Sequence, residues 1–357
     1  MGVALVKKRI QWADMLRVVA TVMVIGIHVV GLYREFYFNN HRTLQFLVID
    51  TVDSIFRFAV PVFFMLTGAF VLTRKIHDIK SFYRKAFFRI FVPFTVFSLA
   101  TWIYYASLDG NWSIIDMLIK FTNNPGLSYQ MWFVYVILTF YLFIPILQRM
   151  VGALSRKMLR TLIILIVAMG SVLGTINIVS SNLGVELFRG VVLPDVLCYL
   201  NYLFIGYYIA KYGIAKRVRL LLYMLGIASV FFIPVVSLTA DNFDQLEDVS
   251  ARSSVFALLI GVSIYTFFKY TVGKVRLKGK VTAMLQSLSS ASFYIYLIHV
   301  VVMDIIRQLL GWGNADIGLT VALPRLAVLM ILTFIVSAII SLAFDVAYRY
   351  FRRRRGV

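Results

Sequence analysis

WADMLRVVATVMVIGIHVVGLY, from Trp12 to Tyr33, decides the fold of this chain. A run of about twenty mostly apolar residues is long enough to cross a bilayer as a helix. Backbone polar groups have no water to bind in the hydrocarbon layer, and the run lacks the alternation of a barrel strand, so we expect a helix. Because the run carries Asp14, Arg17 and His28 and no small-residue cleavage site follows it, we expect it to be retained rather than cleaved as a signal peptide.

Similar apolar runs recur along the whole chain, separated by charged or turn residues. Each is long enough for one membrane crossing. The sequence therefore predicts an all-α polytopic membrane protein, a bundle of about ten transmembrane helices. The predicted spans are 12–33, 52–73, 87–107, 131–149, 160–180, 195–212, 220–239, 252–270, 287–310 and 323–348.

The composition excludes an ordinary cytosolic enzyme. Of the 357 residues 61% are hydrophobic, and the mean hydropathy is +0.86, well above what soluble domains show. The single cysteine, Cys198, forms no intrachain disulfide and no CxxC-type zinc site. We therefore predict no metal.

The positive charge follows the loops. The chain has 36 lysines and arginines against 16 acids, a net charge of +20 that in a soluble protein would suggest nucleic acid. Here most basic residues fall in alternate loops, which predicts both termini in the cytoplasm, an even number of spans and no nucleic-acid partner. We expect residues 1–357 to form one membrane-embedded domain without a separate soluble domain, in the plasma or inner membrane. The basic segments are 7–9, 74–89, 149–160, 211–219, 269–280 and the tail from Arg349.

One helical stripe in the first span carries the densest set of ionisable groups. At about 100° per residue, the eleven steps from Arg17 to His28 end close to three full turns, and Glu35 lies seven residues further on the same line. His28 is then about 16 Å deeper than Arg17. A neutral imidazole can take a proton from a hydroxyl, and a guanidinium can hold an anion. The alternative is a packing histidine with a snorkelling arginine.

Other polar residues in the predicted spans are weaker candidates. Asp53 and Arg57 are spaced for an i,i+4 pair, and Arg57 either holds an acceptor or an oxyanion or merely locks its helix. Trp132 fits an aromatic belt or a sugar-stacking platform. His299, three residues after Tyr296, fits an inter-helix hydrogen bond or a catalytic role. Three carboxylates, of Glu35, Asp50 and Glu186, would face outside, where they could orient an imidazole or bind sugar hydroxyls.

Five segments follow one another along the chain: R-x10-H (Arg17 to His28), RFAVPVFFMLTG (57–68), FYRKAFFRIFVPF (82–94), MWFVYVILTFYLFIPIL (131–147) and SFYIYLIHV (292–300). In this order they resemble the integral-membrane acyltransferase family 3, whose members O-acylate surface polysaccharides and related glycans. The resemblance covers residues 11 to about 300.

The resemblance implies roles for particular residues. His28 would be the catalytic base, Arg17 would help to place the acyl donor, and the donor would be cytoplasmic acyl-CoA, with acetyl-CoA the first expectation. Arg84, Lys85 and Arg89 are then candidates for the CoA phosphates, with positive-inside topology as the alternative. The family's R-x-x-R is not kept here, because Ala86 stands three residues before Arg89.

These observations favour a membrane O-acyltransferase acting on a cell-surface or lipid-linked glycan. Further candidate substrate contacts are Glu35, Trp132, Tyr296 and His299. His28 would deprotonate the acceptor hydroxyl, and Arg57 or a backbone donor would stabilise the oxyanion. Transfer is direct or proceeds through an acylated side chain. The alternatives are a transporter or flippase for a glycan or lipid intermediate and a membrane sensor or binding module.

Overall fold

Helices build the whole described structure. The computed structural model describes residues 9–40, 44–123, 126–185, 187, 195–251, 253–312 and 317–354, so Glu186 lies outside the described residues. Within these ranges no strand occurs, and nine helical segments are long and apolar enough to cross a membrane. The prediction of an all-α polytopic membrane protein is confirmed.

The nine candidate spans correspond to nine of the predicted ones, and several contain a break or a π-helical turn. Such turns arise where one residue too many is wound into an α-helix. In chain order the spans are α1 (Gln11–Asn40); α2 (Leu44–Phe56), α3 (Ala59–Thr67) and the π turn η1 (Gly68–Leu72); α4 (Ile79–Ala86), the π turn η2 (Phe87–Phe91) and α5 (Val92–Asp109); the 3₁₀ turn η3 (Tyr129–Met131) and α7 (Trp132–Ala153); α8 (Arg156–Ile166), the π turn η4 (Val167–Val172) and α9 (Leu173–Asn182); α11 (Lys216–Ser237); α13 (Val255–Tyr270) with the 3₁₀ turn η5 (Val272–Lys274); α14 (Gly279–Leu309); and α15 (Leu319–Arg354).

The predicted span 195–212 is also helical, as α10 (Asp195–Tyr212), although it is not among the nine apolar candidates. Its residues contact α3, η1, α7 and α8, and polar Asn201 within it is only 1% exposed. A helix surrounded by protein does not need the apolar surface that lipid demands. Its 18 residues span about 27 Å, close to the thickness of the hydrocarbon layer.

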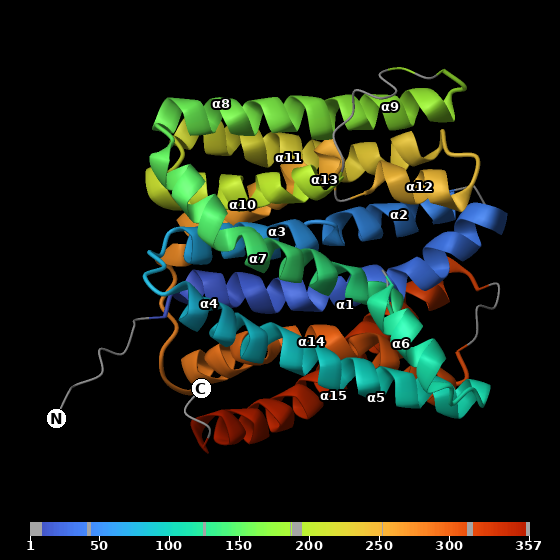
Figure 1. Cartoon of the computed structure of the whole chain (residues 1–357). Helices are drawn as coiled ribbons and strands as arrows, with labels where there is room; N and C mark the ends of the chain where they lie inside the picture. Colours follow the sequence, from blue (N-terminus) through green and yellow to red (C-terminus); the bar gives the residue numbers. More distant parts are fainter. Residues whose placement is uncertain are drawn as a thin grey trace.

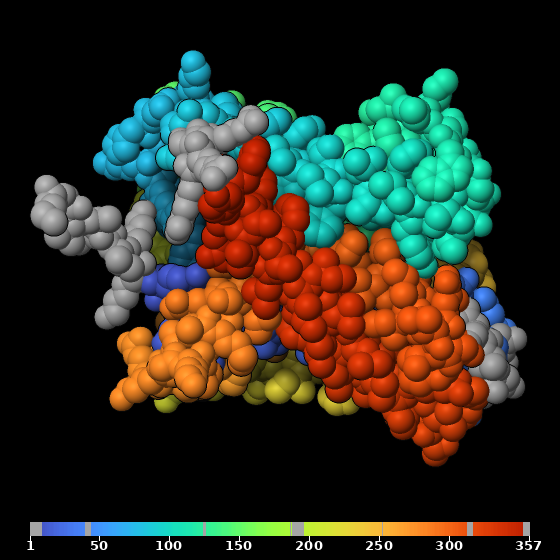
Figure 2. Space-filling model, turned by 90° about the horizontal axis from the view of Figure 1, so that it is seen from below, coloured from blue at the N-terminus to red at the C-terminus, as the bar shows by residue number. Residues whose placement is uncertain are grey.

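The bundle has one end at which the basic loops gather, called the basic end below. α1 begins there and α15 ends there, on the left in Figure 1, so the chain crosses the bundle an even number of times. Two short helices, α6 (Ile114–Thr122) and α12 (Phe243–Val249), lie at the opposite end. On one face, α15 packs along α14, beside α4 and α5 (Figure 2). The same view shows the start of α1, in blue, at the bottom of a hollow between α4 and the start of α14.

Pro61 explains the break that separates α2 from α3. A proline has no N–H to donate to the carbonyl four residues earlier, which here belongs to Arg57. The helix is interrupted at Arg57 and Phe58, and α3 restarts at Ala59. The break places the Arg57 side chain where two helical segments meet.

Two glycines bring α10 into backbone contact with the second span. A Cβ on Gly68 would lie 1.9 Å from the Leu203 carbonyl oxygen, and one on Gly206 would lie 2.0 Å from that of Met65. Small residues at a helix crossing allow this close approach inside membranes.

Gly206→Ala is expected to destabilise the protein. The added methyl group meets a backbone carbonyl that cannot rotate away, and overpacking of this kind costs about 1–3 kcal/mol. Thermal unfolding in detergent measures the effect, with Gly152→Ala in α7 as control because a Cβ there meets nothing within 4 Å. Equal melting temperatures for the two variants would contradict the contact.

Candidate functional site

α1 and α14 run parallel, and α14 packs along the part of the stripe between Arg17 and His28. Near the basic end, the Arg17 Nη1 donates to the Ser289 Oγ at 2.9 Å. Eleven residues further along α1, the ring of His28 lies 5.1 Å from the ring of His299, centroid to centroid. Because His299 follows Ser289 by ten residues, the register of the two helices is nearly constant over this length.

His28 lies among aromatic and imidazole rings, and its side chain is half-buried. The ring of Tyr129 meets it edge-on at a centroid distance of 5.0 Å. Tyr129 belongs to η3, which precedes α7, so three separate spans meet at this histidine. Below, "imidazole cluster" denotes His28, Tyr129, Tyr296 and His299.

His299 is fully buried and its tautomer is fixed by its contacts. Its Nδ1 lies 2.6 Å from the Tyr296 carbonyl oxygen. A carbonyl oxygen only accepts hydrogen bonds, so Nδ1 carries the proton and Nε2 presents a lone pair. Among the described residues, Nε2 has no hydrogen-bond partner. The imidazole cluster therefore contains a buried acceptor that none of the described residues satisfies.

Tyr296 joins the cluster to the start of α7. Its ring lies 5.6 Å from that of His299, and its hydroxyl donates to the Gln130 carbonyl oxygen. The tyrosine is 5% exposed. Two of the predicted substrate contacts, Tyr296 and His299, thus lie next to the predicted base His28.

The basic end holds the other half of the stripe. Asp14, 3% exposed, accepts through Oδ1 from the Arg9 Nη2 at 3.0 Å, the Arg17 Nη1 at 3.4 Å and the Ser289 Oγ at 2.5 Å. One carboxylate therefore orients two guanidinium groups. The Arg17 side chain stays 27% exposed, so it can still meet an anion.

The predicted phosphate ligands lie at the same end. Three cations are exposed on α4 and η2, those of Arg84, Lys85 and Arg89. The positive charge of Arg89 lies near enough to interact electrostatically with that of Arg17. The segment that carries them, α4 and η2, lies on one side of the hollow that Figure 2 shows over the start of α1. Positive charge on this scale attracts polyanions from the adjoining solution.

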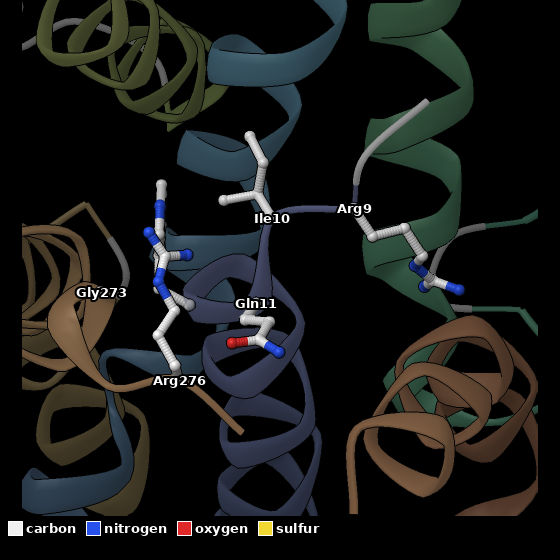
Figure 3. A pocket seen from close by; sticks show the side chains of 6 residues that line it. Arg9, Ile10, Gln11, Gly273 and Arg276 are labelled. Atoms are coloured by element: carbon white, nitrogen blue, oxygen red, sulfur yellow. The ribbon is translucent and has the colours of Figure 1, made fainter. Parts of the chain in front are cut away.

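A cavity of about 370 Å³ also opens at the basic end. Figure 3 shows Arg9 and Arg276 on opposite sides of Gln11 in its lining. The Gln11 side chain holds the loop in place, because its Nε2 donates to the Leu277 carbonyl at 2.8 Å and its Oε1 accepts from the Leu277 N–H at 3.2 Å. The cavity adds one further guanidinium group, that of Arg276, at this end of the bundle.

A buried ion network occupies the opposite end of α1 and α2. Fully buried Arg34 pairs with Asp50 and Glu247. Arg57 is 2.6 Å from Asp53 through Nε and 3.2 Å from the Glu247 Oε1 through Nη2. The predicted Asp53–Arg57 pair is confirmed, and Glu247 brings α12 into the same network. The catalytic role predicted for Arg57 stays a prediction, and its described contacts are with these acids.

The remaining predicted contacts lie apart from the imidazole cluster. Glu35 is exposed. Trp132, at the start of α7, lies half-buried with its ring 5.7 Å from that of Tyr199. Within the described residues, no group of three or more His, Cys, Asp or Glu side chains is placed to hold a metal ion.

Sequence reasoning missed several residues that the fold brings to these sites. Tyr129 and Gln130 precede an apolar run and give no motif signal. Because the apolar run ends at Tyr33, the sequence indicates an external loop at Arg34. Nothing in the sequence indicates that Glu247 lies near Arg34. Their partners are distant in sequence, so spacing along one helix could not reveal them.

A parallel pair of helices thus joins a cationic end to a half-buried imidazole within an all-helical membrane protein. The family model described as an acyltransferase domain, of acyltransferase family 3, matches residues 10–342. The chain therefore belongs to this family, and it is a multi-pass membrane protein with an acyltransferase domain. No curated protein and no solved structure matches it.

Proposed function

We propose that the protein is a membrane O-acyltransferase that moves an acyl group, with acetyl the first expectation, from cytoplasmic acyl-CoA to a hydroxyl of a cell-surface or lipid-linked glycan. The observation that carries the proposal is the α1–α14 pair. It places Arg17 beside Ser289 near the basic end and His28 beside His299 further in. One continuous face thus offers a cation to the donor and a base to the acceptor.

The donor side follows from the chemistry of CoA. Its phosphates cannot enter the hydrocarbon layer, whereas its thin acyl-bearing arm can pass between helices. The exposed cations of α4 and η2 would hold the phosphates, and Arg17 would meet the arm at the start of the stripe. His28, about 16 Å deeper, would then lie near the thioester.

The acceptor side requires a base and a means to hold a hydroxyl. His28 would take the hydroxyl proton while the oxygen attacks the thioester carbonyl. The buried lone pair of the His299 Nε2 supplies an acceptor for a hydrogen bond from the sugar. Trp132 and Glu35 would contact the rest of the glycan.

The function is tested by following both halves of the reaction. The purified protein in nanodiscs is incubated with [¹⁴C]acetyl-CoA and a glycan extract, and labelled glycan and free CoA are measured together. We expect equal amounts of label transferred and thiol released. Glycan movement across the membrane of proteoliposomes without CoA consumption would instead support a transporter. If the protein shows neither acyl transfer nor glycan movement, a binding module is supported.

Replacing the exposed cations Arg84 and Lys85 by neutral residues is expected to weaken the binding of acetyl-CoA. In Arg84→Gln/Lys85→Gln, the KM for acetyl-CoA should rise about tenfold or more with little change in kcat, because hydrogen bonds to charged groups contribute about 1.5–3 kcal/mol each. Lys157→Gln, exposed on α8 at the same end, is the control for general loss of charge. A KM equal to that of the control would assign these residues to topology alone.

A further inference from the structure

A buried amide beside the imidazole cluster has no partner for its donor nitrogen. Gln130 is 0% exposed. Its side-chain Oε1 accepts from the Ser128 hydroxyl, and its backbone carbonyl oxygen accepts from the Tyr296 hydroxyl. The side-chain Nε2 finds no acceptor among the described residues. Leaving a buried donor unsatisfied destabilises the folded protein, and such a group requires an explanation.

The contacts of Gln130 tie it to the imidazole cluster from two directions. Tyr129, the preceding residue, contacts the His28 ring. Tyr296, which donates to the Gln130 carbonyl, contacts His299. The two histidine rings lie against each other. The backbone of Gln130 therefore lies between the residues that contact the two imidazoles, and its side-chain amide is buried beside them.

The amide is also held rigidly. η3 is a tight turn in which the Met131 N–H donates to the Ser128 carbonyl at 3.0 Å. Both Gln130 and Met131 are fully buried, and the Ser128 hydroxyl fixes the amide oxygen. A donor that is already oriented needs no reorganisation when charge develops near it.

We propose that the Gln130 Nε2 is the oxyanion donor of the acyl transfer; the inference rests on the function proposed above. His28 removes the proton of the acceptor hydroxyl, and the oxygen forms a bond to the thioester carbonyl carbon. The carbonyl π electrons move to its oxygen, where the amide N–H groups bind the negative charge. Collapse breaks the C–S bond, and the CoA thiolate takes the proton back from His28, giving the ester and free CoA.

Two other polar groups that the sequence analysis considered, Arg57 and His299, do not fit this role. The Arg57 guanidinium is directed at Asp53 and Glu247. The His299 Nε2 is an acceptor, because Nδ1 holds the proton, and an acceptor repels an oxyanion. His299 suits the incoming hydroxyl, and the Gln130 amide suits the charge that forms on the thioester oxygen.

The test separates transition-state stabilisation from donor binding. Gln130→Met removes the donor at similar size, and Gln130→Glu keeps one oxygen and replaces the amide nitrogen. We expect kcat to fall about 100-fold in both, with the KM for acetyl-CoA, the thermal stabilisation by CoA and the melting temperature near wild-type values. Asn201→Leu is the matched control, because Asn201 in α10 is another buried amide that has no partner among the described residues. The kcat of this variant should stay near that of the wild type.

Three results would overturn the inference. The first is a wild-type kcat in a folded Gln130→Met or Gln130→Glu variant. The second is a loss of activity in Gln130→Glu together with loss of CoA stabilisation, which would make the amide a structural support. The third is a wild-type protein that transfers no acyl group, in which case the proposed function fails first and the inference falls with it.

Discussion

His28→Gln is expected to lower kcat for acyl transfer by about 10²- to 10⁴-fold, the usual contribution of a general base. Glutamine fills similar space and keeps hydrogen-bonding capacity, but it cannot accept a proton at neutral pH. Since His28 is half-buried and contacts Tyr129 and His299 through its ring, the substitution should leave the bundle folded. Initial rates with [¹⁴C]acetyl-CoA measure the effect.

The matched control is His77→Gln, because His77 is exposed in the loop between η1 and α4. Its rate should equal that of the wild type. Stabilisation by CoA reports whether the donor site survives in both variants, since a ligand that binds the native state raises its apparent stability. Label transfer that persists at the wild-type rate in His28→Gln would remove this residue as the base.

Arg34→Met is expected to destabilise the protein by about 3–5 kcal/mol, the range found when one member of a buried ion pair is removed. Arg34 is fully buried and pairs with Asp50 and Glu247, while Asp53 lies 3.7 Å from its Nε. After the exchange, Arg57 alone must balance three carboxylates. Thermal or denaturant unfolding in detergent measures the loss.

The control is the exposed pair Asp116–Lys120 on α6. Lys120→Met should change stability by at most about 1 kcal/mol, because solvent already screens that pair. A second variant, Arg34→Met/Asp50→Asn, should recover part of the loss by removing one unbalanced charge. If Arg34→Met unfolds at the same temperature as Lys120→Met, the network does not hold α12 to α1 and α2.

The sequence predicted individual helices well for a local reason. In a bilayer each span must satisfy its backbone within itself, so the length and composition of one segment decide its structure. The span 195–212 is α10 with the same bounds, and the pair Asp53–Arg57 followed from i,i+4 spacing. Even the meeting of two helices at Gly68 was predictable, because only a missing side chain permits such an approach.

The site was less accessible to this kind of reasoning. Spacing placed Arg17 and His28 on one face, but nothing in the sequence said that α14 would lie against it in parallel. Gln130 has no motif around it, and its importance comes from what surrounds its amide. Arg34 follows the end of the apolar run, and only its distant partner Glu247 on α12 accounts for its burial.

By itself, then, the sequence determined where the helices are and which ionisable side chains share a helical face, because both depend on hydrogen bonds and geometry within one segment. Only the tertiary structure decided which faces meet. It brought His28 to His299, Arg34 to Glu247 and Tyr296 to Gln130. Those contacts arise from packing between segments far apart in the chain, where many apolar surfaces are interchangeable and the few polar groups must find partners together.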